Sequence, residues 1–447
     1  MQGLNPRQRE AVRYLDGPSL VLAGAGSGKT RVITAKIAHL IQHSQLSPRN
    51  IYAVTFTNKA AREMKGRVSK LLADTKGLNI STFHTLGLKL LHREHKTAGL
   101  RSGFSIFDEQ DVQQLLKELA KKNEADKDAL QQARRQISHW KNTLVTPEAA
   151  LSQANDDLQT FYALLYQAYL EALHAYNAVD FDDLILRPVE LLQQHAELRE
   201  RWQNRVRYLL VDEYQDTNNA QYELIKLLVG TQARLTVVGD DDQSIYAWRG
   251  ARPENMVQLR DDFPQLNVIK LEQNYRSTGR ILGAANHLIS NNSHVFEKRL
   301  WSELGPGDPI RIIHCADEES EAERVVSELI QHRFNHSTPF NHYAILYRGN
   351  HQARPFEKAL RTHNIPYFVS GGTAFFARSE VKDVMGYLRL ISNTDDDAAL
   401  LRIINTPRRE IGSSTLEKLG HYATQRHCTL FTAIDELGLE QHLSARA

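Results

Sequence analysis

The sequence has little of what marks a secreted, membrane-spanning or metal-binding protein. Its two cysteines, Cys315 and Cys428, lie far apart and form neither a disulfide framework nor a metal-ligand spacing. The first residues, MQGLNPRQREAV, lack the apolar core of a signal peptide, and no run approaches the roughly 18 apolar residues of a membrane span. The 19 histidines show no metal-ligand pattern. We therefore expect a soluble, cytoplasmic protein that is not attached to a membrane.

A strong charge bias is also missing, because the formal net charge is only +2. A basic surface for a polyanion would therefore have to be local. With 447 residues, of which 41% are hydrophobic and 24% charged, the chain has an ordinary globular composition and room for about three domains.

Apolar runs of strand length alternate with helical patterns over much of the chain. These runs lie at 18–23, 51–57, 207–213, 234–240, 268–275, 310–315 and 343–349. Residues 105–200, rich in Gln, Ala, Leu and Lys, indicate a helical insertion, and the chain is again helical from about residue 378. The alternation predicts an α/β fold with a mainly parallel sheet.

The stretch AGAGSGKT follows the first predicted strand and precedes a predicted helix. It is a variant of the phosphate-binding loop G-x-x-x-x-G-K-[ST], with Ala23 at the first glycine position. Such a loop turns backbone N–H groups toward phosphate oxygens, and the next helix directs its positive end at them. Lys29 would reach the β- and γ-phosphates, and Thr30 would ligate Mg²⁺. The alternative is a glycine-rich turn with a chance Lys-Thr. The candidate nucleotide-binding residues here are Ala23, Gly24, Ala25, Gly26, Ser27, Gly28, Lys29 and Thr30.

A phosphate loop of this kind needs a carboxylate for its metal at the end of a hydrophobic strand. LLVDEYQD (209–216) offers such a carboxylate. Asp212 would hold Mg²⁺, mostly through water, and Glu213 would activate the attacking water as a general base. The alternative is that the two acids only cap a strand or begin a helix.

The stretch VVGDDDQSIYAWRGA (237–251) combines two kinds of chemistry. Its acid and amide side chains suit a metal–phosphate site. Its aromatic side chains beside an arginine suit a single-stranded nucleic acid, because stacking on bases is independent of sequence.

Six motifs together resemble those of superfamily 1 DNA helicases of the UvrD/Rep family. They are AGAGSGKT (23–30), TFTNKAAREM (55–64), STFHTLG (81–87), LLVDEYQDT (209–217), VVGDDDQSIYAWRGA (237–251) and LEQNYRS (271–277). The resemblance implies an ATP-driven 3′-to-5′ DNA helicase that acts in replication or repair. Its DNA partners would be single strands and fork junctions, and its state a monomer or a DNA-induced dimer.

The resemblance also implies roles for particular residues. Gln8 would read the edge of adenine, and Arg31 and Tyr275 would stack on its two faces. Gln243 would sense the γ-phosphate, and Arg276 would be an arginine finger that stabilises the transferring phosphoryl group. The positions that match the single-strand path are Phe56, Asn58, Thr82, His84, Tyr246, Trp248 and Arg249.

Each DNA candidate also has an ordinary structural explanation. Trp248 alone would be a core or interface residue, and His84 a satisfied polar residue. Lys59, Arg62 and Lys65 could meet phosphates or form a solvated helix face. Their placement on successive strand-end loops of one sheet favours function, because open α/β sheets bind ligands at that edge.

The family organisation divides the chain into two RecA-like lobes with mainly helical insertions. The predicted parts are a first lobe (1–85 and 197–277), its insertion (86–196), the first half of a second lobe (278–375) and part of a second insertion (376–447). Gly371 and Gly372 suit a hinge. We expect VDFDDLI (179–185) to be a structural return to the first lobe, with Phe181 a minor candidate for base contact.

The sequence stops at LSARA, within the second insertion as that family is organised. The family's last two motifs, one with a second arginine for the γ-phosphate, would follow it. We expect an incomplete second sheet with an open edge and an uncovered apolar face. The chain would be the amino-terminal portion of a helicase or, alternatively, a protein that binds ATP·Mg²⁺ and single-stranded DNA without unwinding. Replication or repair proteins are its expected protein partners.

Overall fold

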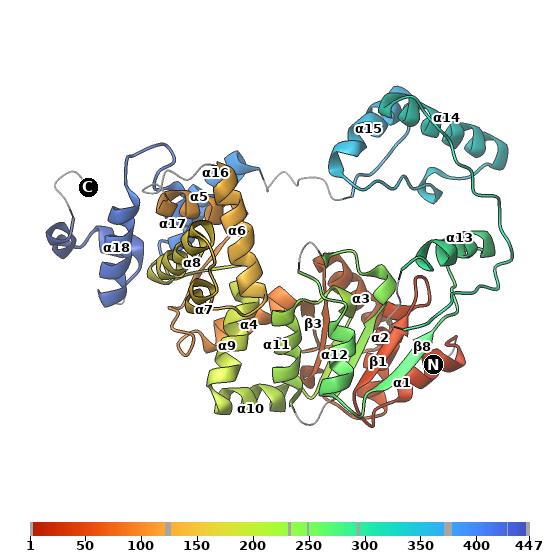
Figure 1. Cartoon of the computed structure of the whole chain (residues 1–447), viewed down its shortest axis with the longest axis horizontal. Coiled ribbons are helices and arrows are strands. Elements are labelled where there is room, and N and C mark those ends of the chain that lie inside the picture. The colour runs from red at the N-terminus through yellow and green to blue at the C-terminus, as the bar shows by residue number, and fades with distance from the viewer. Residues whose placement is uncertain are drawn as a thin grey trace. The chain divides into compact units, whose positions relative to one another are not determined.

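The computed structural model of the chain describes residues 3–120, 127–230, 234–247, 250–292, 296–370, 378–426 and 428–443. The predicted hinge glycines, Gly371 and Gly372, lie outside these residues. The strands are β1 (Ser19–Ala23), β2 (Ile51–Thr55), β3 (Asn79–Thr82), β4 (Ser105–Phe107), β5 (Ala178–Asp180), β6 (Tyr208–Val211), β7 (Leu235–Gly239) and β8 (Asn267–Leu271) (Figure 1). The helices are α1 (Pro6–Arg13), α2 (Lys29–Gln42), α3 (Asn58–Leu71), α4 (Phe83–Glu94), α5 (Glu109–Leu119), α6 (Lys127–Asn142), α7 (Pro147–Ser152), α8 (Asp157–Ala175), α9 (Asp183–Gln194), α10 (Ala196–Arg205), α11 (Asn219–Val229), α12 (Asn255–Asp262), α13 (Gly279–Ile289), α14 (Glu318–His336), α15 (Ala353–Thr362), α16 (Ser379–Ser392), α17 (Asp397–Ile403), α18 (Ser413–Arg426) and α19 (Leu430–Ile434).

Six strands form one parallel sheet in the order β3-β2-β6-β7-β1-β8. Leu20 of β1, for example, pairs with Val237 of β7 on one side and Val268 of the edge strand β8 on the other. β1, β2, β6 and β7 are buried along their whole length, as expected for parallel strands covered on both faces. The predicted α/β fold with a parallel sheet is therefore confirmed.

Helices cover the two faces of this sheet and close two apolar cores. On one face, α1, α2 and α3 contribute Ala11, Val32 and Met64. On the other face, α4, α9, α10, α11 and α12 contribute Leu86, Leu184, Leu198, Leu224 and Leu259. Because every strand is parallel, the carboxyl ends of β1, β2, β3, β6 and β7 meet at one edge of the sheet.

Helices α5, α6 and α8 form a separate core that includes Trp140, Tyr166 and Tyr169. The short parallel pair β4–β5 joins this core, although we predicted few strands here. VDFDDLI (179–185) holds charges that are paired internally: the Lys141 ammonium lies 2.7 Å from Asp180 Oδ2 and 2.8 Å from Asp183 Oδ1. This arrangement is what a structural segment requires. The division of the chain into two lobes and two insertions remains a prediction.

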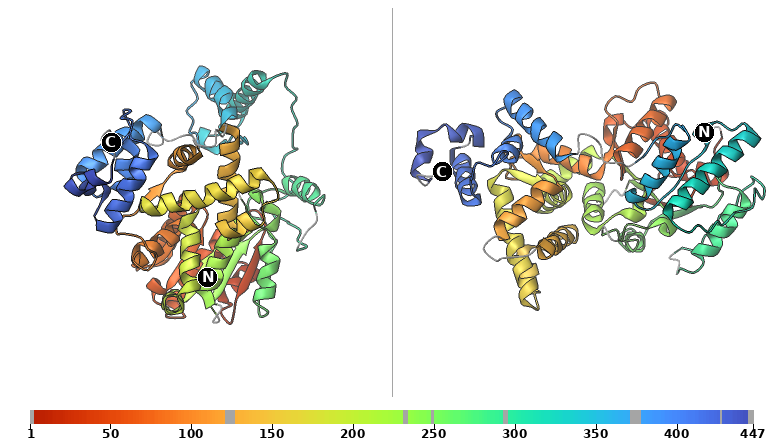
Figure 2. Two further views of the ribbon diagram at one scale, coloured as in Figure 1. Left: turned by 60° about the vertical axis from the view of Figure 1, so that its left-hand side comes forward. Right: turned by 90° about the horizontal axis from the view of Figure 1, so that it is seen from above.

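Residues 308–385 form a second compact unit. Its helices α14 and α15 lie side by side and enclose a small core that includes Val326 and Leu360 (Figure 2). The strands that we predicted at 310–315 and 343–349 are wrong for this structure, since neither segment pairs with a described residue. An extended segment without a neighbour cannot satisfy its N–H and C=O groups within a sheet, and so it stays irregular.

The expected incomplete second sheet is not seen among the described residues of this unit, but apolar side chains in the two segments are exposed. Ile312 is 82% exposed and Leu346 is 93% exposed. Among the described residues of the whole chain, no helix has the length and apolar character needed to cross a membrane.

Candidate nucleotide and nucleic-acid site

The turn between β1 and α2 is the first part of the candidate site. Gly26 and Gly28 have positive φ angles of 68° and 91°, which glycine adopts without strain. Ser27 Oγ donates to the carbonyl oxygen of Gly24 at 2.7 Å and so holds the turn. Within the described part of the chain, no side chain caps the amino end of α2, where a helix offers N–H groups and partial positive charge to an anion.

Lys29, the first residue of α2, faces the end of β6. Its Nζ lies 3.2 Å from Glu213 Oε2, and this buried amine makes no well-aligned hydrogen bond with any side chain or backbone group that the structure describes. Glu213 has φ 51° and ψ 44°, a conformation that few non-glycine residues adopt. The strained turn points the Glu213 carboxylate at the phosphate loop instead of along the strand.

Asp212 lies beside this ion pair and is only 3% exposed. Burial, and then the charge of Glu213, raise the pKa of Asp212 to about 7. The two adjacent carboxylates at this strand end repel each other, so a bound cation would stabilise their ionised forms. A hydroxyl and a carboxylate are oxygen ligands of the kind that Mg²⁺ prefers, so Thr30 and Asp212 suit this ion.

Gln215 connects the end of β6 with the end of β7. Its Nε2 donates to Glu213 Oε2 at 3.0 Å, and its Oε1 accepts from the backbone N–H of Asp240 at 3.0 Å. The side chain is 2% exposed, so both bonds are shielded from water. We did not predict this residue, although it lies two positions after Glu213 in a motif that we singled out.

The three aspartates after β7 surround a lysine. Lys298 Nζ lies 2.7 Å from Asp240 Oδ1 and 3.1 Å from Asp242 Oδ2, and it also pairs with Asp241. Burial would lower the pKa of Lys298, but Asp240 and Asp241 raise it overall. Gln243 donates from Nε2 to Asp240 Oδ2. Lys298, which no local sequence pattern indicates, thus offsets one of the three negative charges in the acidic run that suggested a metal–phosphate site.

The segment after β8 is fixed to the phosphate loop. Asn274 is 2% exposed, and its Nδ2 donates to the Ala25 carbonyl at 2.5 Å. Its Oδ1 accepts from the N–H groups of Arg276 and Ser277 at 2.8 and 2.7 Å. The Tyr275 N–H donates to the Gly26 carbonyl at 3.0 Å. Tyr275 and Arg276 therefore stand exposed beside the loop, and Asn274 is the residue that holds them there.

The three adenine candidates gather at the start of α1. Gln8 Nε2 donates to the Ser27 carbonyl at 2.9 Å, and Gln8 Oε1 accepts from Asn5 N at 3.0 Å. Asn5 Nδ2 donates to the Tyr275 hydroxyl at 2.8 Å. A Cβ added at Gly3 would lie 2.6 Å from Arg31 Nη2. Beyond these two bonds, the Gln8 amide keeps one N–H and one oxygen lone pair with which it would read an adenine edge.

The DNA candidates within the described chain follow the carboxyl ends of neighbouring strands. Phe56 and Asn58 follow β2; Phe56 is half-buried, its ring 6.2 Å from that of Phe83, and Asn58 is exposed. His84 follows β3, and its ring centre lies 6.0 Å from that of the exposed Phe181. Burial lowers the pKa of His84, which favours the neutral ring.

Of the remaining DNA candidates, one caps a helix, one is half-buried and two lie outside the described residues. Thr82 caps α4 by accepting the Thr85 N–H, so part of its role is structural. Tyr246 follows Gln243 after β7 and is half-buried. Trp248 and Arg249 lie outside the described residues.

Comparison with known proteins identifies the group to which this arrangement belongs. The profile of the UvrD/REP helicase N-terminal domain matches residues 4–264, and that of the UvrD-like helicase C-terminal domain matches residues 269–441. The chain belongs to the UvrD/Rep helicase family. The resemblance predicted from six motifs is thereby confirmed.

Individual members of the UvrD/Rep family align along almost the whole chain. The ATP-dependent DNA helicase Rep of Salmonella typhimurium is 60% identical over 446 residues, and that of Escherichia coli is 59% identical; each alignment covers 99% of this chain and 66% of the relative. The ATP-dependent DNA helicase PcrA of Staphylococcus epidermidis is 44% identical over 440 residues, covering 98% of this chain and 60% of the relative. The chain thus spans about two thirds of the length of the Rep relatives. The roles of individual site residues remain predictions.

Proposed function

We propose that this chain carries the motor of an ATP-dependent DNA helicase that moves 3′ to 5′ along single-stranded DNA in replication or repair. The relatives are named ATP-dependent DNA helicases, which supports the activity. The observation that carries the proposal is the shared edge of the sheet, where phosphate-site and DNA candidates follow neighbouring parallel strands. Its setting would be the cytoplasm, as a monomer or a DNA-induced dimer working at forks with replication or repair proteins.

Hydrolysis would use the groups around the phosphate loop. Lys29 would contact the β- and γ-phosphates, and Mg²⁺ held by Thr30 and Asp212 would neutralise charge on them. Glu213 would accept a proton from the attacking water, helped by its orientation from Gln215. Arg276 would stabilise charge on the transferring phosphoryl group, while Gln8, Arg31 and Tyr275 would hold adenine.

Hydrolysis would be linked to DNA movement by the turn after β7. Gln215 bonds to both Glu213 and the backbone of Asp240, and Asp240 accepts from Gln243. Tyr246 lies three residues beyond Gln243, so a shift of Gln243 toward or away from the γ-phosphate would move Tyr246 and Trp248 against the bases. A Gln243→Ala variant should therefore hydrolyse ATP with little stimulation by DNA. Tight coupling of hydrolysis to translocation in this variant would refute the linkage.

The first experiment is ATP hydrolysis by the chain with and without single-stranded DNA, in the presence of Mg²⁺. We expect stimulation by DNA and a loss of about 10²–10³-fold in turnover for Lys29→Ala, because a cation on the phosphates is removed. Lys117→Ala, at an exposed position of α5, is the control. Nucleotide binding without turnover, with or without DNA, would contradict the motor and favour a protein that binds ATP and DNA without unwinding.

A further inference from the structure

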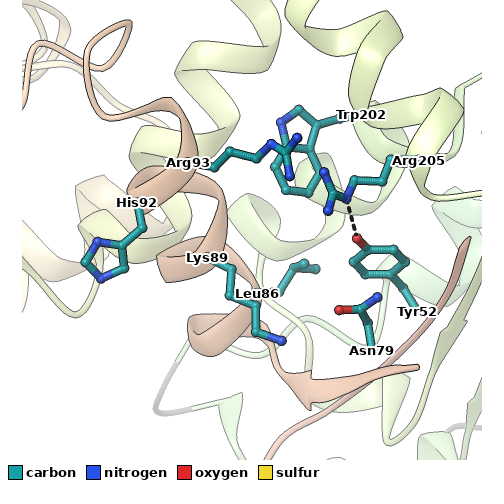
Figure 3. A pocket seen from close by; sticks show the side chains of 8 residues that line it. All are labelled: Tyr52, Asn79, Leu86, Lys89, His92, Arg93, Trp202 and Arg205. Carbon is teal, nitrogen blue, oxygen red and sulfur yellow. Dashed lines mark hydrogen bonds between the residues drawn. The ribbon is translucent and has the colours of Figure 1, made fainter. Parts of the chain in front are cut away.

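A second polar recess lies at the opposite edge of the same sheet. It is a cavity of about 420 Å³ between α4, α10 and the starts of two strands (Figure 3). Tyr52 and Asn79, near the amino ends of β2 and β3, form its floor, and Lys89, Arg93, Trp202 and Arg205 line its walls. None of these residues belongs to the candidate site described above. The strand from Tyr52 to Phe56 spans on the order of 13 Å, which separates the two sites along the sheet.

Two of the three cations in the cavity lack an acidic partner within the described chain. Among the residues that the structure describes, Lys89 and Arg205 form no ion pair with a carboxylate. Arg205 instead donates from Nε to the Tyr52 hydroxyl at 3.2 Å and lies 5.6 Å from the centre of the Trp202 ring. Three cations in one recess repel one another unless an anion is bound between them.

Glu94, an acid that contacts residues of the recess, is already engaged. Glu94 accepts from Trp202 Nε1 at 3.1 Å through Oε1 and from Arg201 at 3.2 Å through Oε2. Its distance to Arg93 Nε is 3.8 Å, longer than a hydrogen bond. Figure 3 shows the guanidinium groups of Arg93 and Arg205 near Trp202. Lys89 lies lower in this view, on α4 like Arg93. The cations of the recess could therefore still bind an anion.

The sheet edge connects this recess with the DNA candidates. β3 is an edge strand, with α3 packed on one face of the sheet and α4 on the other. Both helices begin at the carboxyl edge, next to Asn58 and His84, and run back toward the recess. Lys65 on α3 and Lys89 on α4 place cations on the two helices that flank β3, and burial, and then the charge of Lys65, lower the pKa of Lys89. Cations thus continue from the carboxyl edge to the cavity.

We propose that Lys89, Arg93 and Arg205 bind backbone phosphates of the DNA strand as it leaves the single-strand path at the carboxyl edge. The inference rests on the proposed function, because it requires that path. A polyanion with a charge on every nucleotide can bring more than one phosphate to the three cations of the recess, whereas a single carboxylate brings one charge.

The test is the salt dependence of DNA binding by the whole chain, measured by fluorescence anisotropy. The probes are oligothymidylates of about 8 and about 16 nucleotides, the shorter covering only the carboxyl edge. The variant is Lys89→Gln/Arg93→Gln/Arg205→Gln. Each phosphate contact with a single strand contributes about 0.7 to the slope of log K against log salt. Between about 50 and about 200 mM salt, wild-type affinity for the longer probe should therefore fall about 20-fold more than that of the variant. The shorter probe should show no difference.

Controls separate this inference from its alternatives. Lys117→Gln/Arg135→Gln/Lys418→Gln removes the same charge from exposed sites on α5, α6 and α18 and should keep the wild-type slope. If the triple variant does not fold, Lys89→Gln alone replaces it, because the Lys89 side chain makes no hydrogen bond to a described residue. This variant should lose about 3-fold less affinity for the longer probe than the wild type over the same salt range.

Several results would overturn the proposal. An unchanged slope for the longer probe would refute it while leaving the proposed function intact, whereas a wild-type chain that binds neither probe would refute the proposed function itself. Equal loss with the control variant would show a non-local charge effect. Binding of labelled polyglutamate that is lost in the cavity variant, with DNA binding unchanged, would assign the recess to an acidic protein segment instead.

Discussion

Strand β2 and residues 343–349 have similar apolar patterns but different fates. β2 pairs with β3 on one side and β6 on the other, and all five of its residues are buried. The segment 343–349 forms no strand, and Leu346 at its centre is 93% exposed. A β-branched, apolar run fits a pleated surface, but the neighbouring strand supplies the hydrogen bonds and the burial. Strand propensity is therefore realised only where the chain also supplies the neighbour.

Charged groups show the same contrast between the two units. The first unit buries Lys36 and Lys141 completely and gives both of them polar partners. In residues 308–385, the described ion pairs, such as Arg311–Glu328 and Lys358–Glu319, lie at the surface. Surface pairs contribute little to stability, whereas a buried charge is costly once its partner is removed. Substitutions can therefore test whether the first unit depends on its internal pairing and the second does not.

The largest effect is expected for Lys141→Met. This change leaves Asp180 and Asp183 buried without their cation, while Met fills a similar volume. We expect a loss of about 3–5 kcal/mol in the free energy of unfolding of the first unit. The measurement is urea unfolding followed by tryptophan fluorescence, since Trp140 precedes Lys141 and stacks on Tyr166 with ring centres 5.7 Å apart.

A rescue variant makes that prediction specific. Adding Asp180→Asn and Asp183→Asn to Lys141→Met removes the unpaired charges and should recover part of the loss. Lys117→Met, at an exposed position of α5, should have almost no effect on the free energy of unfolding. If Lys141→Met cost no more than Lys117→Met, the buried pairs would not support this unit.

Sequence patterns predicted the parts of the fold and site that depend on local order. The strand–glycine–helix order around Lys29 and the acids after β6 lie where parallel topology brings them together. Residues that act across the fold carried no local signal. Lys298 reaches Asp240 from 58 residues away along the chain, and Asn274 supports the loop from the far side of β8. Strands 310–315 and 343–349 were predicted wrongly because propensity carries no information about a missing neighbour.

A smaller effect separates the two regions at the level of single apolar side chains. Leu210 of β6 is fully buried, so Leu210→Ala should cost about 2–5 kcal/mol through lost contacts and a cavity. Leu346→Ala should change stability by less than about 0.5 kcal/mol because the side chain is already in water. Hydrogen exchange read by mass spectrometry reports both segments in one experiment. A large loss of protection around 343–349 in Leu346→Ala would show that this segment is packed after all.

The smallest effect is a slope in the pH dependence of stability that only the first unit should show. Lys36 is fully buried, and burial lowers its pKa to about 7, while its Nζ donates to the carbonyls of Ala11 and Tyr14 at 2.9 and 2.7 Å. Between this folded pKa and the unfolded value of 10.5, the unfolded chain binds more protons, so stability rises with pH. From about pH 7 to about pH 9 the gain should be about 2–3 kcal/mol in the free energy of unfolding of the first unit.

Lys36→Met should flatten this rise, and Lys117→Met should keep it. His39, whose pKa is lowered by burial and then by His43 and Lys36, titrates below this window. An equal rise in wild type and Lys36→Met would mean that another group carries the dependence.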